Sequence, residues 1–155
     1  MARPKFINSG SCGLMKYRLT DVLACPYDKT FPLRLVVLKR AEHPERQYTW
    51  PRKPFCEEYC AYRDLKIKEH PKPDALPCEE CHRWEIETGV IYCPTCGRWF
   101  PIIEEIPRML PDELRNEKEE LAFLESVAQD LRKAAPDTAD KILTQGKPFN
   151  LTNKK

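Results

Sequence analysis

The spacing of the cysteines constrains the fold of this chain more than any other feature. Six of its eight cysteines form three close pairs, Cys56 and Cys60, Cys78 and Cys81, and Cys93 and Cys96. Two cysteines two or three residues apart can present both sulfurs to one zinc ion, which takes four ligands in a tetrahedron. Gly97 follows the last pair, where a residue without a Cβ atom allows a tight turn. The pattern therefore predicts a small fold whose loops are held together by bound zinc.

Close cysteine pairs can also form disulfides or dithiol redox centres. The first fourteen residues lack the apolar run of a secretory signal, so we expect a cytoplasmic protein with reduced thiols. A redox pair usually stands at the start of a helix, whereas Cys96 is followed by glycine and by strand-forming residues. Zinc binding is therefore favoured over both alternatives.

The ligands can be combined in two ways. In the nested arrangement, one site lies within a single segment of the chain and consists of Cys56, Cys60, Cys78 and Cys81. The other site then consists of Cys25, Asp28, Cys93 and Cys96. Its aspartate stands three residues after Cys25, at the position where the second cysteine of a pair is expected. In the sequential arrangement, the last two pairs form a zinc ribbon and the earlier cysteines lack a full ligand set. The nested arrangement leaves fewer cysteines without partners and is preferred, so we expect one or two zinc ions per chain.

Residues 15–40 predict the first part of a small β domain. Residues 15–24 predict a short strand and then a helical turn capped by Thr20 or Asp21. The run from Phe31 to Lys39 is rich in aliphatic residues and predicts a strand.

Residues 89–111 predict the second part of the same domain. The stretches 88–92 and 98–103 predict strands on either side of the last cysteine pair, and Pro101 places the second strand at an edge or a bend. We expect an α+β fold in which the two parts, distant in sequence, form one antiparallel sheet.

The segment between the two parts, residues 41–88, has a different character. It contains six prolines and two cysteine pairs, so metal binding rather than long regular elements should organise it. At the start of the chain, residues 1–14, which include Cys12, are expected to be a disordered extension.

Residues 112–155 predict a helical C-terminal extension. Asp112 to Ala135 carries leucine, valine and alanine at three- and four-residue steps, which is typical of an amphipathic helix. Pro136 should end this helix, and a shorter one should run from about Thr138 to Gln145.

Composition narrows the function classes. The chain has 26 basic and 24 acidic residues, which argues against a nucleic-acid binder driven by overall charge. No segment approaches the roughly 20 apolar residues that span a bilayer, so no membrane partner is expected. The sequence contains no phosphate-binding loop, nucleophile elbow or other recognisable catalytic motif. We therefore expect a protein that is not an enzyme.

Three stretches of the chain resemble one known family. They are Met15-Lys-Tyr-Arg-Leu-Thr-Asp-Val-Leu-Ala-Cys-Pro26, Tyr92-Cys-Pro-Thr-Cys-Gly-Arg-Trp-Phe-Pro-Ile102 and Ile106-Pro-Arg-Met-Leu-Pro111. They resemble the start and the end of the small zinc-binding methyltransferase activators, shared partners of tRNA, rRNA and release-factor methyltransferases. The C-terminal helix and the segment 146–149 resemble archaeal members of this family.

The resemblance implies a function and a partner surface. Such an activator has no catalytic group and forms a heterodimer with an S-adenosylmethionine-dependent methyltransferase by strand addition. It reaches tRNA or rRNA only indirectly, through the complex. The apolar contacts would come from Phe100, Ile102, Ile103, Ile106, Pro107, Met109 and Leu110.

The main alternative is a zinc-ribbon protein that binds RNA or the ribosome. Basic and aromatic side chains could form a surface that stacks on bases and contacts phosphates. The residues of this hypothetical surface are Lys66, Lys68, Lys72, Arg83, Arg98, Arg108, Tyr62, Trp84 and Trp99.

Overall fold

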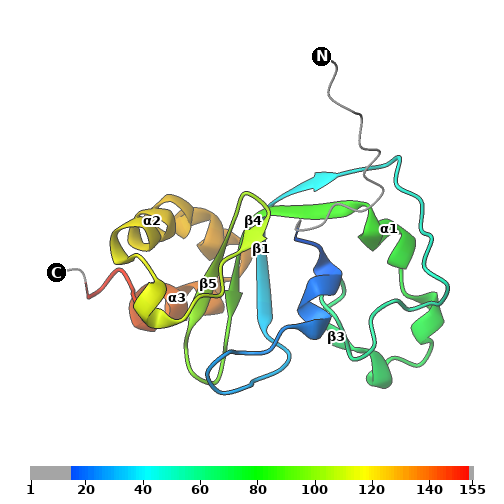
Figure 1. Ribbon diagram of the computed structural model, residues 1–155, viewed down its shortest axis with the longest axis horizontal. Helices are drawn as coiled ribbons and strands as arrows, with labels where there is room; N and C mark the ends of the chain where they lie inside the picture. Colours follow the sequence, from blue (N-terminus) through cyan, green and yellow to red (C-terminus); the bar gives the residue numbers. More distant parts are fainter. Residues whose placement is uncertain (1–14, 154–155) are drawn as a thin grey trace, which may run out of the picture.

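A four-stranded antiparallel sheet lies at the centre of the computed structural model, which describes residues 15–153 (Figure 1). The strands are β1 (Arg34–Glu42), β4 (Trp84–Tyr92), β5 (Trp99–Ile103) and β6 (Ile106–Pro107), in the order β1-β4-β5-β6. The sheet thus joins two parts of the chain that are far apart in sequence, and the predicted α+β class is confirmed. The expected disorder of residues 1–14, including Cys12, lies outside the described residues.

The longest ladder of the sheet pairs β1 with β4. It runs from Arg34 opposite Tyr92 to Glu42 opposite Trp84. The strand β4 therefore begins four residues before the predicted start, and residues 84–88, which we expected in the inserted segment, belong to the sheet. The reason lies in the alternation of apolar and acidic residues in this stretch, which suits a strand.

The secondary structure of the N-terminal segment differs from the prediction. Residues Tyr17–Val22 form a 3-10 helix, η1, and the short strand expected within 15–24 is absent there. Met15 instead uses its backbone to bridge two parts of the sheet. Its N–H donates to the Glu105 carbonyl oxygen at 2.8 Å, and its own carbonyl accepts from the Ile86 N–H at 2.8 Å.

Two helices cover one face of the sheet (Figure 1). They are α2 (Glu117–Ala134) and α3 (Pro136–Gln145). Their buried side chains pack on this face in a core that includes Val36, Val90, Tyr92, Trp99, Leu124, Leu131 and Ile142. None of the helices between residues 15 and 153 has both the length and the apolar character needed to cross a membrane.

The helix α2 begins later than the sequence predicts. Asp112 lies in a separate 3-10 turn, η4 (Asp112–Leu114), and Asn116 is the residue that caps α2. The Asn116 side chain accepts a hydrogen bond from the Glu119 N–H at 3.1 Å, which satisfies one of the unpaired donors of the first turn.

The other face of the sheet is covered by η1 and by residues 43–83. Regular structure in this segment is short, as its proline density predicts. Its elements are β2 (Tyr59–Cys60), β3 (Leu65–Lys66), η2 (Ile67–Glu69), η3 (Pro73–Ala75) and α1 (Cys78–His82). The core on this side includes Met15, Ile86, Ile91, Phe100 and Ile102. Six cysteines also belong to it, namely Cys25, Cys56, Cys60, Cys78, Cys81 and Cys93.

Candidate metal centre

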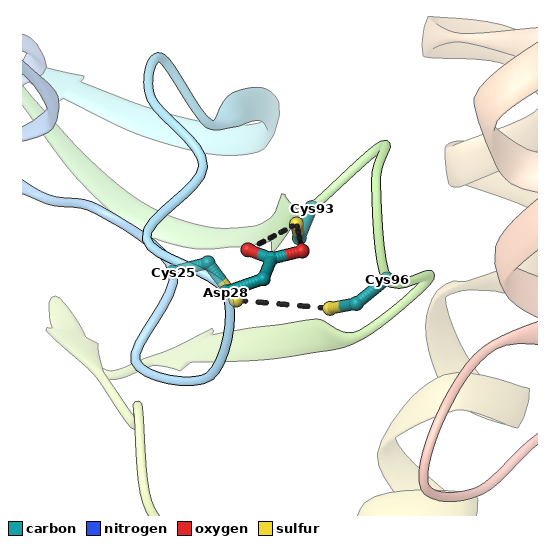
Figure 2. A group of neighbouring side chains, drawn as sticks. All are labelled: Cys25, Asp28, Cys93 and Cys96. Atoms are coloured by element: carbon teal, nitrogen blue, oxygen red, sulfur yellow. Dashed lines mark hydrogen bonds between the residues drawn. The ribbon is translucent and has the colours of Figure 1, made fainter.

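Two loops bring together four of the predicted ligands (Figure 2). Cys25 and Asp28 lie in the loop before β1, and Cys93 and Cys96 lie in the turn between β4 and β5. One ligand atom from each residue is within 4.8 Å of the other three. The group joins the two parts of the chain that form the sheet.

The two loops have the same backbone geometry. The Lys29 N–H donates to the Cys25 carbonyl oxygen, and the Gly97 N–H donates to the Cys93 carbonyl oxygen, each at 3.0 Å. The fourth residue after each cysteine has a positive φ, 62° at Lys29 and 79° at Gly97. Glycine adopts this conformation without a Cβ penalty, which explains Gly97, whereas Lys29 adopts it at some cost.

Asp28 supplies the negative charge of the centre. Its Oδ1 accepts the Thr30 N–H at 3.0 Å, and both of its oxygens lie 3.6 Å from the Cys93 sulfur. The hydrogen bonds from Thr30 lower the pKa of Asp28 to about 2. The carboxylate is therefore ionised at neutral pH, as a metal ligand must be.

The thiols differ in their tendency to ionise. Burial raises the pKa of Cys25 to about 12, although the backbone N–H groups of Asp28 and Tyr27 oppose this. Burial also disfavours ionisation of Cys96, but hydrogen bonds from Arg98 and Cys93 outweigh it and lower the pKa of this thiol. The two sulfurs lie 3.7 Å apart, so Cys96 is the first of this pair to become a thiolate.

This donor set fits a zinc ion. Three thiols and one carboxylate at mutual distances below 4.8 Å match the number and the type of ligands that zinc accepts, and the soft sulfurs disfavour magnesium and calcium. Four protein ligands leave no position for a reactive water, which is typical of a structural rather than a catalytic site.

The four cysteines of the inserted segment lie elsewhere. Each is buried, and all four line one small cavity of about 10 Å³, but they are not part of the group of possible metal ligands that the described residues bring together at Cys25. The pair in α1 precedes β4, whereas Cys93 follows it, so the nine residues of this strand separate them. At about 3.3 Å per residue, that separation is incompatible with the sequential zinc ribbon.

The predicted partner-binding residues divide into two groups. Phe100 and Ile102 have 0% of their surface exposed and belong to the core beneath the insertion, so these two side chains cannot contact a partner. Ile106 and Leu110 are 53% and 42% exposed, and the partly buried members of the set are Ile103, Pro107 and Met109.

Several residues of the alternative RNA-binding surface are engaged with other residues of the protein. Arg98 lies 3.6 Å above the Tyr27 ring and forms an ion pair with Asp112 at 2.8 Å. Trp99 is fully buried, and the Trp84 ring lies 3.8 Å below the Arg40 guanidinium.

Lys68 and Lys66 of the same surface are paired with glutamates at 3.0 and 3.7 Å. Arg98, Trp84 and Trp99 are therefore engaged in contacts within the protein, whereas the two lysines are exposed on its surface.

Sequence reasoning did not identify the contacts of two residues, Tyr27 in a loop of the centre and Asp21, which binds the inserted segment. In the sequence, Tyr27 lies between the ligands Cys25 and Asp28, and its hydroxyl oxygen accepts the Asp112 N–H at 2.6 Å. Asp21 accepts the backbone N–H groups of residues 57–59 at 2.8 to 2.9 Å. The contacts of both residues are with segments far away in sequence, so no local signal could have indicated them.

Comparison with models of known families places most of the described chain in one family. The family described as Trm112p-like protein matches residues 16–105, a range that includes all four ligands of the candidate centre, the strands β1, β4 and β5, and the inserted segment. No curated protein matches the chain. More than half of the chain is covered, and it therefore belongs to the Trm112p-like family of non-catalytic methyltransferase activators.

Proposed function

We propose that this protein is the activating subunit of a heterodimer with an S-adenosylmethionine-dependent methyltransferase that acts on tRNA, rRNA or a release factor in the cytoplasm. The observation that carries this proposal is the family match over residues 16–105. The chain itself supplies a docking edge and a rigid support for that edge, and the partner supplies the chemistry.

The docking edge that we propose is β6 with the residues that follow it. An edge strand offers unpaired backbone groups to a strand of another protein. Ile106 and Leu110 expose large apolar side chains beside this edge, and such side chains can enter pockets of a partner. Ile103, Pro107 and Met109 are partly buried and would complete the contact.

The opposite edge of the sheet is less suited to strand addition. The groove along β1 has a volume of about 230 Å³, and its walls include Tyr59 and Asp64 of the inserted segment and Ala134 at the end of α2. A strand that paired with β1 would have to fit between these walls. The shorter β6 edge has the more exposed apolar side chains.

The metal centre supports the docking edge through Tyr27. This residue lies between the ligands Cys25 and Asp28, and its hydroxyl oxygen accepts the Asp112 N–H at 2.6 Å. Arg98 binds Asp112 and lies over the Tyr27 ring. Zinc held by Cys25, Asp28, Cys93 and Cys96 would fix the two loops and, through these contacts, the segment that follows β6.

Co-expression tests the proposal. The chain is produced with tagged S-adenosylmethionine-dependent methyltransferases, the complexes are isolated through the tag, and methyl transfer to tRNA, rRNA and release factor is measured with and without the chain. We expect one or more methyltransferases to retain the chain and to gain solubility or activity from it. Failure of every methyltransferase to retain the chain would contradict the proposal.

Matched variants locate the docking edge. Ile106→Asp combined with Leu110→Asp should abolish retention, because the charges would be desolvated in the interface. Val22→Asp is the control, since Val22 is 71% exposed but belongs to η1. If Val22→Asp disrupted the complex and the double variant did not, the proposed edge would be wrong.

A further inference from the structure

The inserted segment gathers four buried cysteines around one cavity. The exposed fractions of Cys56, Cys60, Cys78 and Cys81 are between 4% and 8%, and none of the four forms a disulfide. The other residues that line the cavity are apolar or aromatic, and none of them carries a charge. Its volume of about 10 Å³ is close to the smallest cavity that can hold one water molecule.

The turn after Cys60 shares two backbone features with the Cys25 loop of the candidate metal centre. The N–H groups of Tyr62 and Arg63 donate to the Cys60 sulfur, as those of Tyr27 and Asp28 donate to the Cys25 sulfur. The fourth residue after Cys60 is Asp64, and its φ is 51°. The residue four positions after Cys60 thus has a positive φ, as the corresponding residues have in the two loops of the candidate centre.

Two further features position the other thiols. Asp21 accepts three successive backbone N–H groups immediately after Cys56 and so fixes the start of the loop that leads to Cys60. Cys78 and Cys81 are three residues apart in α1, a spacing that places both side chains on one face of a helix. Cys81 is within electrostatic range of the other three thiols.

Two arginines lie close enough to the thiols to act on them electrostatically. Arg18 interacts electrostatically with Cys56, and Arg63 does so with Cys60. Arg18 is held in place by its contact with the Trp50 ring at 4.0 Å and by a hydrogen bond to the Phe55 carbonyl oxygen. Four thiolates around a divalent cation carry a net charge of about −2, which these two arginines would offset in part, since the carboxylates of Asp21 and Glu80 act on Cys56 and Cys81 in the opposite sense.

We propose that Cys56, Cys60, Cys78 and Cys81 bind a second, structural zinc ion inside the inserted segment. Each thiol loses its proton to solvent as the sulfur binds the metal, so four protons are released for one zinc ion. In a tetrahedral site with bonds of about 2.3 Å, the sulfurs lie roughly 3.8 Å apart. The four thiols line one small cavity, and they would gather around it to reach this spacing.

A second zinc site in the inserted segment would stabilise the chain whether or not the protein binds a methyltransferase. Residues 43–83 have little regular structure, so a bound metal would supply much of the stability of the segment. The segment would then be a rigid cover over one face of the sheet rather than a mobile loop.

The zinc content of the full-length protein tests the proposal. Native mass spectrometry of the zinc-loaded chain should show two zinc ions. The variant Cys78→Ser with Cys81→Ser should keep one, held by the centre in Figure 2. The matched variant Cys25→Ser with Cys93→Ser should also keep one, held by the insertion. A wild-type chain that binds a single zinc ion and keeps it in the first variant would overturn the proposal.

Cobalt substitution separates the two sites without altering the insertion. In the Cys25→Ser and Cys93→Ser variant, bound cobalt should give the intense absorption of a tetrahedral site with four thiolates. If this variant remains folded by circular dichroism and binds neither zinc nor cobalt, the second site does not exist. If the Cys78→Ser and Cys81→Ser variant fails to fold, the cobalt spectrum of the other variant decides the question.

Discussion

Asp21 makes more contacts with distant backbone than any ligand of the candidate centre. Its two carboxylate oxygens accept three N–H groups from residues 57–59 at 2.8 to 2.9 Å. We predict that Asp21→Ala lowers the free energy of unfolding by about 1.5 kcal/mol, because hydrogen bonds to a charged acceptor are lost. Thermal unfolding should show a Tm lower by roughly 4 °C for a chain of this size, and hydrogen exchange at residues 57–59 should become faster.

Asp130→Ala is the control for this prediction. Asp130 is exposed on α2, and surface substitutions of this kind usually change stability by less than about 0.5 kcal/mol. Equal effects of the two substitutions would show that Asp21 has no special role.

Individual residues of the candidate site were predictable where their role depends on local spacing. Asp28 was predicted as a ligand because it stands three residues after Cys25, and the structure places it beside the three cysteines. The contacts of Asp21 were not predictable, because they arise from the folding of a remote segment onto η1. Phe100 and Ile102 were expected at a partner surface, but β5 is covered on both faces, so both its outward and its inward positions are buried.

The start of α2 shows how tertiary contacts override an element's local signal. Pro111, Asp112 and Glu113 carry the signature of a helix start, yet α2 begins at Glu117. Asp112 is instead held by Arg98 and Tyr27 of the metal-centre loops. The number and type of the C-terminal helices were thus predictable, and the position of this boundary was not.

The ion pair that holds η4 against β5 makes a pH-dependent contribution to stability. The hydrogen bonds from Arg98 lower the pKa of Asp112 below its ordinary value of 3.8. A carboxylate with a lowered pKa stabilises the folded state above that ordinary value, and the contribution is lost as the pH falls through the folded-state pKa. We predict that Asp112→Asn costs about 1 kcal/mol at neutral pH and progressively less below about pH 4.

Chemical denaturation of the wild type and the Asp112→Asn variant at a series of pH values measures this difference. Comparison of the two chains at each pH removes the effect of the other carboxylates, which both share. A difference that stayed constant down to the lowest pH would contradict the assigned role of the Arg98 pair.

At the scale of the whole molecule, the candidate centre joins loops from two parts of the chain that the sheet already pairs. The ladder between β1 and β4 and most of both cores are formed by residues outside these loops, although Cys25 and Cys93 are themselves buried in the core on the insertion side. We therefore predict that Cys93→Ser leaves the far-UV circular dichroism nearly unchanged but lowers the free energy of unfolding by about 3 kcal/mol, roughly 10 °C in Tm. Hydrogen exchange should accelerate in residues 25–30 and 93–98 and stay slow in the ladder; global acceleration would mean that the fold depends on this metal.

A substitution that adds a thiol to the centre, rather than removing one, tests whether Asp28 belongs to the ligand set. Asp28→Cys places a fourth thiol at the position where the carboxylate now lies within 4.8 Å of the other three ligand atoms. Zinc binds thiolate more strongly than carboxylate when the other ligands are soft, so this variant should retain zinc longer in competition with a chelator and unfold at a higher temperature than the wild type. Cobalt bound to the variant should absorb as a four-thiolate site. Asp28 contacts Cys93 and accepts a hydrogen bond from Thr30, and these contacts alone would keep it near the centre. If zinc retention and the cobalt spectrum of the variant equal those of the wild type, the carboxylate lies near the metal without binding it, and only the cysteines join the two loops.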